Sequence, residues 1–274
     1  MSTAPAVGTE PPSTAAVAAI TAEHFSLSYP RSGAGAGAGV QALRDMSLQV
    51  GRGELVSLIG PSGCGKSTFL KAVADLLPRA GIGGTLRVNG LTPREARQSN
   101  QFSFVFQAPT LLPWRTVREN VAMPLQVIPR RAARGTVDVD DLLARVGMAD
   151  FADAYPHECS GGMQQRVAIA RALTLSPSVL LMDEPFGALD EITREQINLE
   201  LLRILGADGP AVVLVTHSIS EAVFLSDRVI VLTGRPGEVR AEIPIDLPKP
   251  RTSLVRREPR FAELEIAVRE ALGV

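Results

Sequence analysis

Short apolar runs alternate along the chain with stretches whose apolar residues are spaced as on one face of a helix. The runs predict strands at 25–29, 42–50, 55–59, 85–88, 102–106, 179–182, 211–216 and 228–232. The helical spacing predicts helices at 66–77, 140–146, 164–173, 220–225 and 259–272, with one more through Ile197, Leu201 and Ile204. Strands that alternate with helices indicate a parallel sheet covered on both faces, so the predicted fold class is α/β.

The pattern changes from Pro109 to about Leu175, where strand runs are absent and prolines interrupt short helical stretches. We therefore expect a helical subdomain at 108–175, inserted into a core formed by 21–107 and 176–274. Residues 1–20 are rich in Ala, Pro, Ser and Thr and predict a disordered tail. The Gly-Ala run at 31–39 predicts a flexible loop.

Composition narrows the class of protein. The formal net charge of the 274 residues is −1, which argues against nucleic acid as the main partner, because phosphate neutralisation needs a basic face. No apolar run is long enough to span a bilayer, and residues 1–20 lack the pattern of a secretory signal. Cys64 and Cys159 are the only cysteines, and we interpret them as two free thiols in a reducing compartment.

A glycine-rich stretch between a predicted buried strand and a predicted helix fits the phosphate-binding pattern G-x-x-x-x-G-K-[ST]. Its residues are Gly60, Pro61, Ser62, Gly63, Cys64, Gly65, Lys66, Ser67 and Thr68. Glycines let successive N–H groups point at phosphate oxygens, and the helix start adds its positive dipole end. We expect Lys66 to neutralise phosphate charge and the Ser67 hydroxyl to bind Mg²⁺. The alternative, a chance glycine-rich turn, does not account for the strand, the helix and the Lys-Ser pair together.

Two carboxylates, Asp183 and Glu184, follow the apolar run at 179–182. Ligands bind at the carboxyl ends of strands in parallel sheets, so Asp183 is a candidate Mg²⁺ ligand and Glu184 a candidate base for an attacking water. Alone, the pair would suit a solvated strand end equally well. His217 and Gln107 each follow a predicted strand, His217 as a candidate γ-phosphate sensor and Gln107 as a candidate contact for Mg²⁺ and water. A lone His after a strand is more often a surface or capping residue.

The segment Cys159-Ser160-Gly161-Gly162-Met163-Gln164-Gln165-Arg166 resembles the signature of the ABC (ATP-binding cassette) family. The other marks of that family follow in the expected order, at Tyr29, the phosphate loop, Gln107, the signature, Asp183-Glu184, Asp190 and His217. The resemblance covers about residues 21–245. It departs from the usual signature at two positions: Cys159 stands for Leu and Met163 for Gln. Met also occurs there in relatives of the nitrate, sulfonate and taurine type, so it does not imply loss of activity.

The resemblance implies a RecA-like P-loop core with an antiparallel β subdomain and a helical insertion, and ATP and Mg²⁺ as ligands. It implies that two chains, most simply a homodimer, pair head to tail. Ser160, Gly161 and Gly162 of one chain would then face the phosphate loop of the other, with Asp190 nearby. Tyr29 would stack on adenine, whereas the alternative is a strand-end tyrosine packed on its neighbours.

The segment from Gln107 to Val117, with its Leu111-Leu112-Pro113-Trp114, looks like the importer version of the part that meets a membrane partner. Local packing is the alternative for this Trp. We therefore expect an ATP-hydrolysing subunit at the cytoplasmic face of the membrane, with separate permease and solute-binding chains and a small anion as solute. Two rival functions are the ATPase of an exporter and a non-transport ABC protein.

Overall fold

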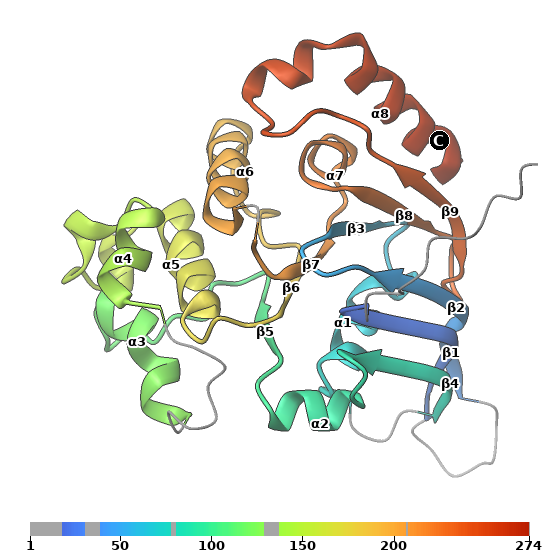
Figure 1. Cartoon of the computed structure of the whole chain (residues 1–274), viewed down its shortest axis with the longest axis horizontal. Helices are drawn as coiled ribbons and strands as arrows, with labels where there is room; N and C mark the ends of the chain where they lie inside the picture. The colour runs from blue at the N-terminus through green and yellow to red at the C-terminus, as the bar shows by residue number, and fades with distance from the viewer. Residues whose placement is uncertain (1–17, 31–38, 78–80, 129–136, 207, 274) are drawn as a thin grey trace, which may run out of the picture.

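The computed structural model describes residues 18–30, 39–77, 81–128, 137–206 and 208–273, and Figure 1 shows how they are arranged. Two sheets organise this part of the chain. The smaller is antiparallel with the order β2-β1-β4, formed by β1 (Ile20–Tyr29), β2 (Val40–Val50) and β4 (Gly81–Val88). The larger has the order β5-β6-β7-β3-β8-β9. Its strands are β3 (Leu55–Ile59), β5 (Phe102–Val105), β6 (Val179–Asp183), β7 (Ala211–Val215), β8 (Arg228–Leu232) and β9 (Val239–Pro244).

The larger sheet is parallel except at β9, which pairs antiparallel with β8 at the edge. All five residues of β3 are buried, because successive side chains enter two different cores. Leu55 and Ile59 face the core shared with the helical insertion and the C-terminal helices. Val56 and Leu58 face the core shared with α1 and the smaller sheet. A strand covered on both faces reads as a continuous apolar run, which explains why this strand was predicted at its true bounds.

The helices lie around the two sheets and in a separate part (Figure 1). The helices α6 (Glu191–Leu205), α7 (Ile219–Leu225) and α8 (Pro259–Leu272) lie on one side of the larger sheet, and α1 (Lys66–Val73) lies on the other. The short α2 (Pro93–Gln98) follows the smaller sheet. The helices α3 (Val117–Val127), α4 (Val139–Arg145) and α5 (Gly161–Leu173) form a separate helical part. It is inserted in the sequence between β5 and β6, and it stands to one side of the sheets. Among the described residues, short 3₁₀ helices span Ala149–Phe151, Pro156–Glu158 and Ser253–Arg257.

Several predicted bounds were wrong for identifiable reasons. The expected tail at 1–20 ran too far, because Ala19 and Ile20 are buried and the Ala19 N–H donates to the Val50 carbonyl at 2.8 Å. Residues 1–17, and all of the expected loop except Gly39, lie outside the described residues. The helix predicted at 66–77 ends at Val73, and Asp75 adopts a left-handed φ of 51° just beyond it. The division into 21–107, 108–175 and 176–274 stays a prediction.

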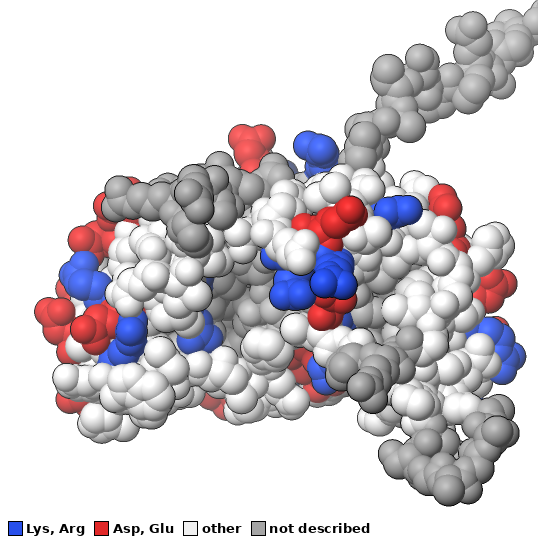
Figure 2. Space-filling model, turned by 90° about the horizontal axis from the view of Figure 1, so that it is seen from below, with Lys and Arg blue, Asp and Glu red and all other residues white. Residues whose placement is uncertain are grey.

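Charged side chains of both signs are interspersed on the face that Figure 2 shows, where Lys and Arg lie beside Asp and Glu. On that face they do not merge into one broad basic surface. Within the described ranges, no helix combines the length and the apolar character needed to cross a bilayer.

Candidate functional site

The candidate residues gather at one edge of the larger sheet, because four neighbouring parallel strands end there. Gln107 follows β5, Asp183 and Glu184 end β6, His217 follows β7 and the loop 60–68 follows β3. These strands are consecutive in the sheet, so their carboxyl ends share one edge. The sheet order therefore brings together residues that the sequence separates widely, as binding sites of open parallel sheets require.

The loop 60–68 curls tightly around its own lysine. Gly63 and Gly65 have φ of 76° and 106°, in the left-handed region that favours glycine. At Gly65 a Cβ would lie 2.6 Å from Leu43 Cδ2, so the loop is also packed closely against β2. Lys66 is 7% exposed, and its ammonium donates to the carbonyl oxygens of Gly60 (2.7 Å) and Pro61 (3.0 Å). The loop thus surrounds the Lys66 ammonium with its own backbone carbonyl groups.

Ser67 and Asp183 meet directly. The Ser67 hydroxyl, in the first turn of α1, donates to Asp183 Oδ1 at 2.6 Å. A hydroxyl and a carboxylate are hard oxygen donors, which suit Mg²⁺ bound together with phosphate oxygens. The pair lies at the end of the loop that carries Lys66, so the donor set fits the metal that the sequence predicts.

Glu184 is held in an unusual backbone conformation. Its φ is 46°, although it is neither glycine nor asparagine, and its N–H donates to the Val215 carbonyl at 2.9 Å. Such conformations persist only where surrounding structure enforces them, and they cluster at functional sites. Glu184 Oε2 lies 3.3 Å from His217 Nδ1, and both side chains are partly open to solvent. Gly187 lies beside both side chains, because a Cβ placed on it would be 3.6 Å from the His217 ring and 3.7 Å from Glu184 Oε2.

Tyr29 and Gln107 sit differently from the other candidates. The Tyr29 hydroxyl lies 3.2 Å from Thr68 Oγ1, and the ring packs against the core below the smaller sheet. This contact fits the packing alternative that the sequence left open for Tyr29, and stacking on adenine stays a prediction. Gln107 is exposed beyond the end of β5, and the rings of Phe106 and Phe104 are tilted to each other with centroids 4.4 Å apart.

The signature residues form the start of α5. Ser160 caps the helix by accepting from the Met163 N–H at 3.3 Å, while Gly161 is exposed and Gly162 is buried. At Gly162 a Cβ would lie 2.8 Å from Thr193 Cγ2, so α5 and α6 approach closely at this point.

Asp190 caps α6 beside the signature. It accepts from the Thr193 N–H at 3.0 Å and from the Thr193 hydroxyl at 2.7 Å, and these bonds lower the pKa of the Asp190 carboxyl. The two cysteines are free and buried. Burial raises the pKa of the Cys159 thiol, whereas Cys64 Sγ lies 3.8 Å from Lys66 Nζ.

The signature and the phosphate loop were expected to meet between two chains, and they do not meet within one. Figure 1 places α5 in the helical part and α1 under the larger sheet, so the signature and the loop 60–68 of one chain lie well apart. The signature therefore has an exposed helix N-terminus that its own loop does not use.

Two residues that the sequence did not single out hold the segment after Gln107. Arg171 of α5 donates to the carbonyls of Pro109 (2.8 Å) and Thr110 (3.0 Å). The buried Asn120 accepts from the Leu112 N–H at 2.8 Å and donates to the carbonyls of Leu112, Arg115 and Thr116. Their roles depend on tertiary contacts, so no local sequence pattern announces them. Trp114, in the segment they hold, is 71% exposed, which contradicts the local-packing alternative for its side chain.

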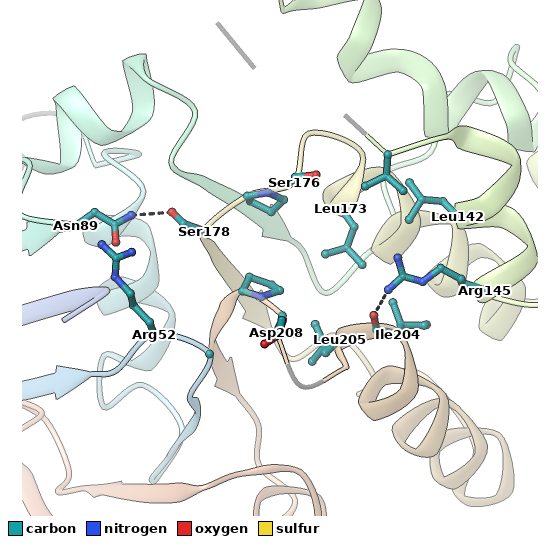
Figure 3. Close-up of a pocket in the computed structure, with 15 residues that line it drawn as sticks. Arg52, Asn89, Leu142, Arg145, Leu173, Ser176, Ser178, Ile204, Leu205 and Asp208 are labelled. Atoms are coloured by element: carbon teal, nitrogen blue, oxygen red, sulfur yellow. Dashed lines mark hydrogen bonds between the residues drawn. The ribbon is translucent and has the colours of Figure 1, made fainter. Parts of the chain in front are cut away.

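A pocket of about 400 Å³ lies at the opposite edge of the larger sheet (Figure 3). Its walls include Ser178 and Pro210, which directly precede β6 and β7. Asn89 donates to the Ser178 hydroxyl at 2.6 Å on one side, and Arg145 donates to the Ile204 carbonyl on the other. None of the predicted site residues lines this pocket, so it is separate from the site described above.

The chain is similar to known proteins over most of its length. The pattern of the ABC transporter family matches residues 43–187. An aliphatic sulfonates import ATP-binding protein of Xanthomonas axonopodis pv. citri is 48% identical over 212 residues, covering 77% of this chain and 82% of the relative. A taurine import ATP-binding protein of Jannaschia sp. is 41% identical over 243 residues, covering 87% and 88%. A dimeric ATP-binding cassette solved in a post-hydrolysis state with ADP and phosphate superposes with a TM-score of 0.67 at 33% identity, covering 82% of this chain and 98% of that one.

Proposed function

This chain belongs to the ABC transporter family, and from that premise we propose that it is the ATP-hydrolysing subunit of an importer for a small anion. The observation that carries the proposal is the meeting of the loop 60–68 with Asp183 and Glu184 at one sheet edge. Ser67 of the loop and Asp183 of β6 are 2.6 Å apart, which joins the phosphate-binding and acidic halves of one site.

The loop binds the phosphates of ATP. Its backbone N–H groups and the N-terminus of α1 attract the phosphate oxygens, and the Lys66 ammonium turns from the carbonyls of Gly60 and Pro61 to the phosphates. Tyr29 and Thr68 lie on the side of the loop that faces the smaller sheet, and Tyr29 exchanges its contact with Thr68 for the adenine ring. The reaction is ATP + H₂O → ADP + phosphate.

Ser67 and Asp183 would hold Mg²⁺, with Gln107 completing the set on the β5 side. The ion supplies positive charge that stabilises the phosphate oxygens during transfer. Glu184 accepts a proton from the attacking water, because its carboxylate stands at the strand end next to Asp183. His217 orients that carboxylate through its contact with Oε2 at 3.3 Å and donates to the γ-phosphate.

Two chains pair head to tail in this proposal. The N-terminus of α5, with Ser160, Gly161 and Gly162, is an anion-binding end that its own loop does not reach. In the pair it closes over the nucleotide on the partner's loop, and Asp190 at the start of α6 lies beside it. The similar cassette with ADP and phosphate is dimeric, which supports the pairing of two chains.

The importer role rests on relatives and on the segment after Gln107. Both curated relatives described above are named as import ATP-binding proteins, one for aliphatic sulfonates and one for taurine. We assign a sulfonate or a similar small anion, such as nitrate, as the solute. Trp114 is exposed on a segment fixed by Arg171 and Asn120, which suits an anchor for a permease at the cytoplasmic face of the membrane. A separate solute-binding chain delivers the anion.

The test is ATPase and transport by the chain with its permease in proteoliposomes. We expect phosphate release from Mg-ATP, stimulated when the solute-binding protein and an alkanesulfonate, taurine or nitrate are added outside. Lys66→Ala abolishes turnover, whereas Lys71→Ala, on the same helix but outside the loop, keeps it. If phosphate release is coupled to outward movement of a solute, the chain is the ATPase of an exporter and not of an importer. Absence of any Lys66-dependent ATPase would overturn the proposal.

A further inference from the structure

His217 is exposed, yet the turn that carries it is fixed on both sides. Thr216 before it is 2% exposed, and its hydroxyl donates to Glu221 Oε2 at 2.5 Å. The same hydroxyl oxygen accepts from the Ser218 N–H at 3.0 Å. The Ser218 hydroxyl in turn accepts from the Glu221 N–H at 3.3 Å. Three hydrogen bonds therefore close the turn between β7 and α7, and two of them end on Glu221.

Glu221 is an unusual residue for this place. It lies in the first turn of α7 and is 5% exposed, although glutamates are almost never fully buried unless they are paired. The cap of α7 does not require it, because Ser218 already supplies the capping hydroxyl. Its second oxygen, Oε1, has no hydrogen-bond partner among the described residues.

The surroundings of Glu221 have opposite effects on the pKa of its carboxyl group. Burial raises the pKa of Glu221, while the hydrogen bond from Thr216 and the positive charges of Arg194, His217 and Arg256 lower it. The group is thus held where burial is costly and only a few partners compensate for it. Among the described residues, its one side-chain hydrogen bond joins it to Thr216, in the turn that carries His217.

We propose that Glu221 is a positioning residue for His217, holding the imidazole toward Glu184 through the hydroxyl of Thr216. The inference rests on the proposed function, because ATP hydrolysis at Glu184 is the reaction that this position serves. The His217 ring reaches Glu184 Oε2 across 3.3 Å, with no other hydrogen bond to hold the ring among the described residues. The orientation of the His217 ring therefore depends on the backbone of the turn, and the hydrogen bond between Thr216 and Glu221 fixes the conformation of that turn.

The C-terminal segment fixes the other end of this connection. Arg256 donates to the Ser220 hydroxyl at 2.5 Å, and its guanidinium carbon lies 4.3 Å from the centre of the Phe224 ring. Arg251 donates to the Phe224 carbonyl at 3.1 Å, at the end of α7. Both ends of α7 are therefore tied to the segment between β9 and α8. These contacts fix the position of α7, and therefore of Glu221, relative to the turn.

The first experiment separates the bond from the fold. Thr216→Val removes the hydroxyl at nearly constant shape, and Thr216→Ser keeps it; Glu221→Leu removes the acceptor, and Glu221→Gln keeps one. Thr174→Val is the matched control, because Thr174 is equally buried and its hydroxyl donates to the Val121 carbonyl at 2.9 Å in the helical part. We measure kcat and KM for Mg-ATP and the melting temperature of each variant.

We expect Thr216→Val and Glu221→Leu to lower kcat about 10–100-fold, since small misplacements of a reacting group have effects of that order. The KM for ATP stays within about twofold, because the phosphate loop is untouched. Thr216→Ser and Glu221→Gln retain most of the activity. Thr174→Val lowers the melting temperature as much as Thr216→Val does but leaves kcat unchanged. Unchanged kcat in folded Thr216→Val would overturn the role while leaving the ATPase itself established.

A second measurement reads the imidazole directly. The chain has only three histidines, so the ring-nitrogen signals of His24, His157 and His217 can be resolved, with His217→Gln to assign the third. In Thr216→Val and Glu221→Leu we expect the His217 signals to move while those of His24 and His157 stay in place. Stationary His217 signals in both variants would contradict the role. An inactive wild-type chain would instead reject the proposed function, and this inference with it.

Discussion

The Ser67 hydroxyl donates to the Asp183 carboxylate at 2.6 Å, which joins two residues that lie 116 positions apart in the sequence. The contact crosses from the first turn of α1 to the end of β6. It closes the gap between the loop that carries Lys66 and the strand that carries Glu184. In the proposed mechanism the same two side chains would hold Mg²⁺.

The first prediction concerns that pair. Asp183→Asn removes the negative charge but keeps a hydrogen-bond acceptor for Ser67, so the fold is expected to persist. The Mg²⁺ concentration for half-maximal ATPase should rise at least about 10-fold, the scale on which altered metal sites lose affinity. Binding of ATP without Mg²⁺ should stay the same or strengthen, because a carboxylate no longer repels the phosphates. Asp75→Asn, which alters a carboxylate paired with Arg97 elsewhere, is the control. An unchanged Mg²⁺ dependence in Asp183→Asn would remove Asp183 from the metal site.

The second prediction separates binding from turnover at Glu184. Glu184→Gln keeps the size of the side chain and removes its basicity, so ATP affinity should be preserved. The kcat should fall by about 10²–10⁴-fold, the usual contribution of a general base. Equilibrium binding and sedimentation should show a dimer that accumulates with ATP and disperses with ADP. Near-normal steady-state ATPase in this variant would make His217 the better candidate for the base.

The third prediction tests the close approach of α5 to α6. In Gly162→Ala the new Cβ meets Thr193 Cγ2 at 2.8 Å, and such overpacking costs about 1–3 kcal/mol. Thr193→Ser removes that methyl group and keeps the hydroxyl that bonds Asp190. The free energy of unfolding of the double variant should therefore recover most of the loss, as a coupling energy in a double-mutant cycle. Additive effects of the two changes would mean that the helices do not press together here.

The fourth prediction concerns Trp114. Because its side chain is 71% exposed, Trp114→Ala should change the free energy of unfolding of the lone subunit by less than about 0.5 kcal/mol. Assembly with the permease should weaken by about 2 kcal/mol or more if the ring is an interface hot spot. Asn120→Ala should weaken assembly and also destabilise the lone subunit, because it leaves the Leu112 N–H without its partner. Transport and assembly that are indifferent to Trp114→Ala would place the permease contact elsewhere.

Continuous apolar runs predicted the centre of the fold closely. The predicted bounds of β3 and β8 agree with the structure, because both strands consist mostly of buried apolar residues. The edge strand β9 was missed because none of its residues is fully buried. The first half of β4 was missed because Gly81, Gly83 and Gly84 supply no side chains to a hydrophobic pattern.

Two missed helices carried a signal that hydrophobic spacing does not detect. α2 and α3 each begin with a capping box, formed by Thr92 with Glu95 and by Thr116 with Glu119. The proline inside α3, Pro124, reads as a breaker. Pro124 has no N–H to donate to the Asn120 carbonyl, yet α3 continues through it, and the Ile128 N–H donates to the Pro124 carbonyl at 3.0 Å.

Local motifs in the sequence predicted some of the candidate site residues. Residues whose contacts form only on folding were not predicted. Lys66, Ser67 and the carboxylates follow from short patterns placed at strand ends. Glu221 and Arg171 act through residues about five and sixty positions away, so their roles exist only in the folded chain.

The distance between the start of α5 and the loop 60–68 also determines how damaged chains behave when they are mixed. Under the proposed pairing, a lone chain completes no site, so turnover in dilute solution grows with the square of the chain concentration. A chain that has lost Lys66 still offers an intact signature, and a chain that has lost Ser160 still offers an intact loop. When these two inactive chains pair, one of the two sites is assembled entirely from undamaged halves. The proposed pairing therefore predicts that a mixture of the two inactive variants recovers ATPase activity.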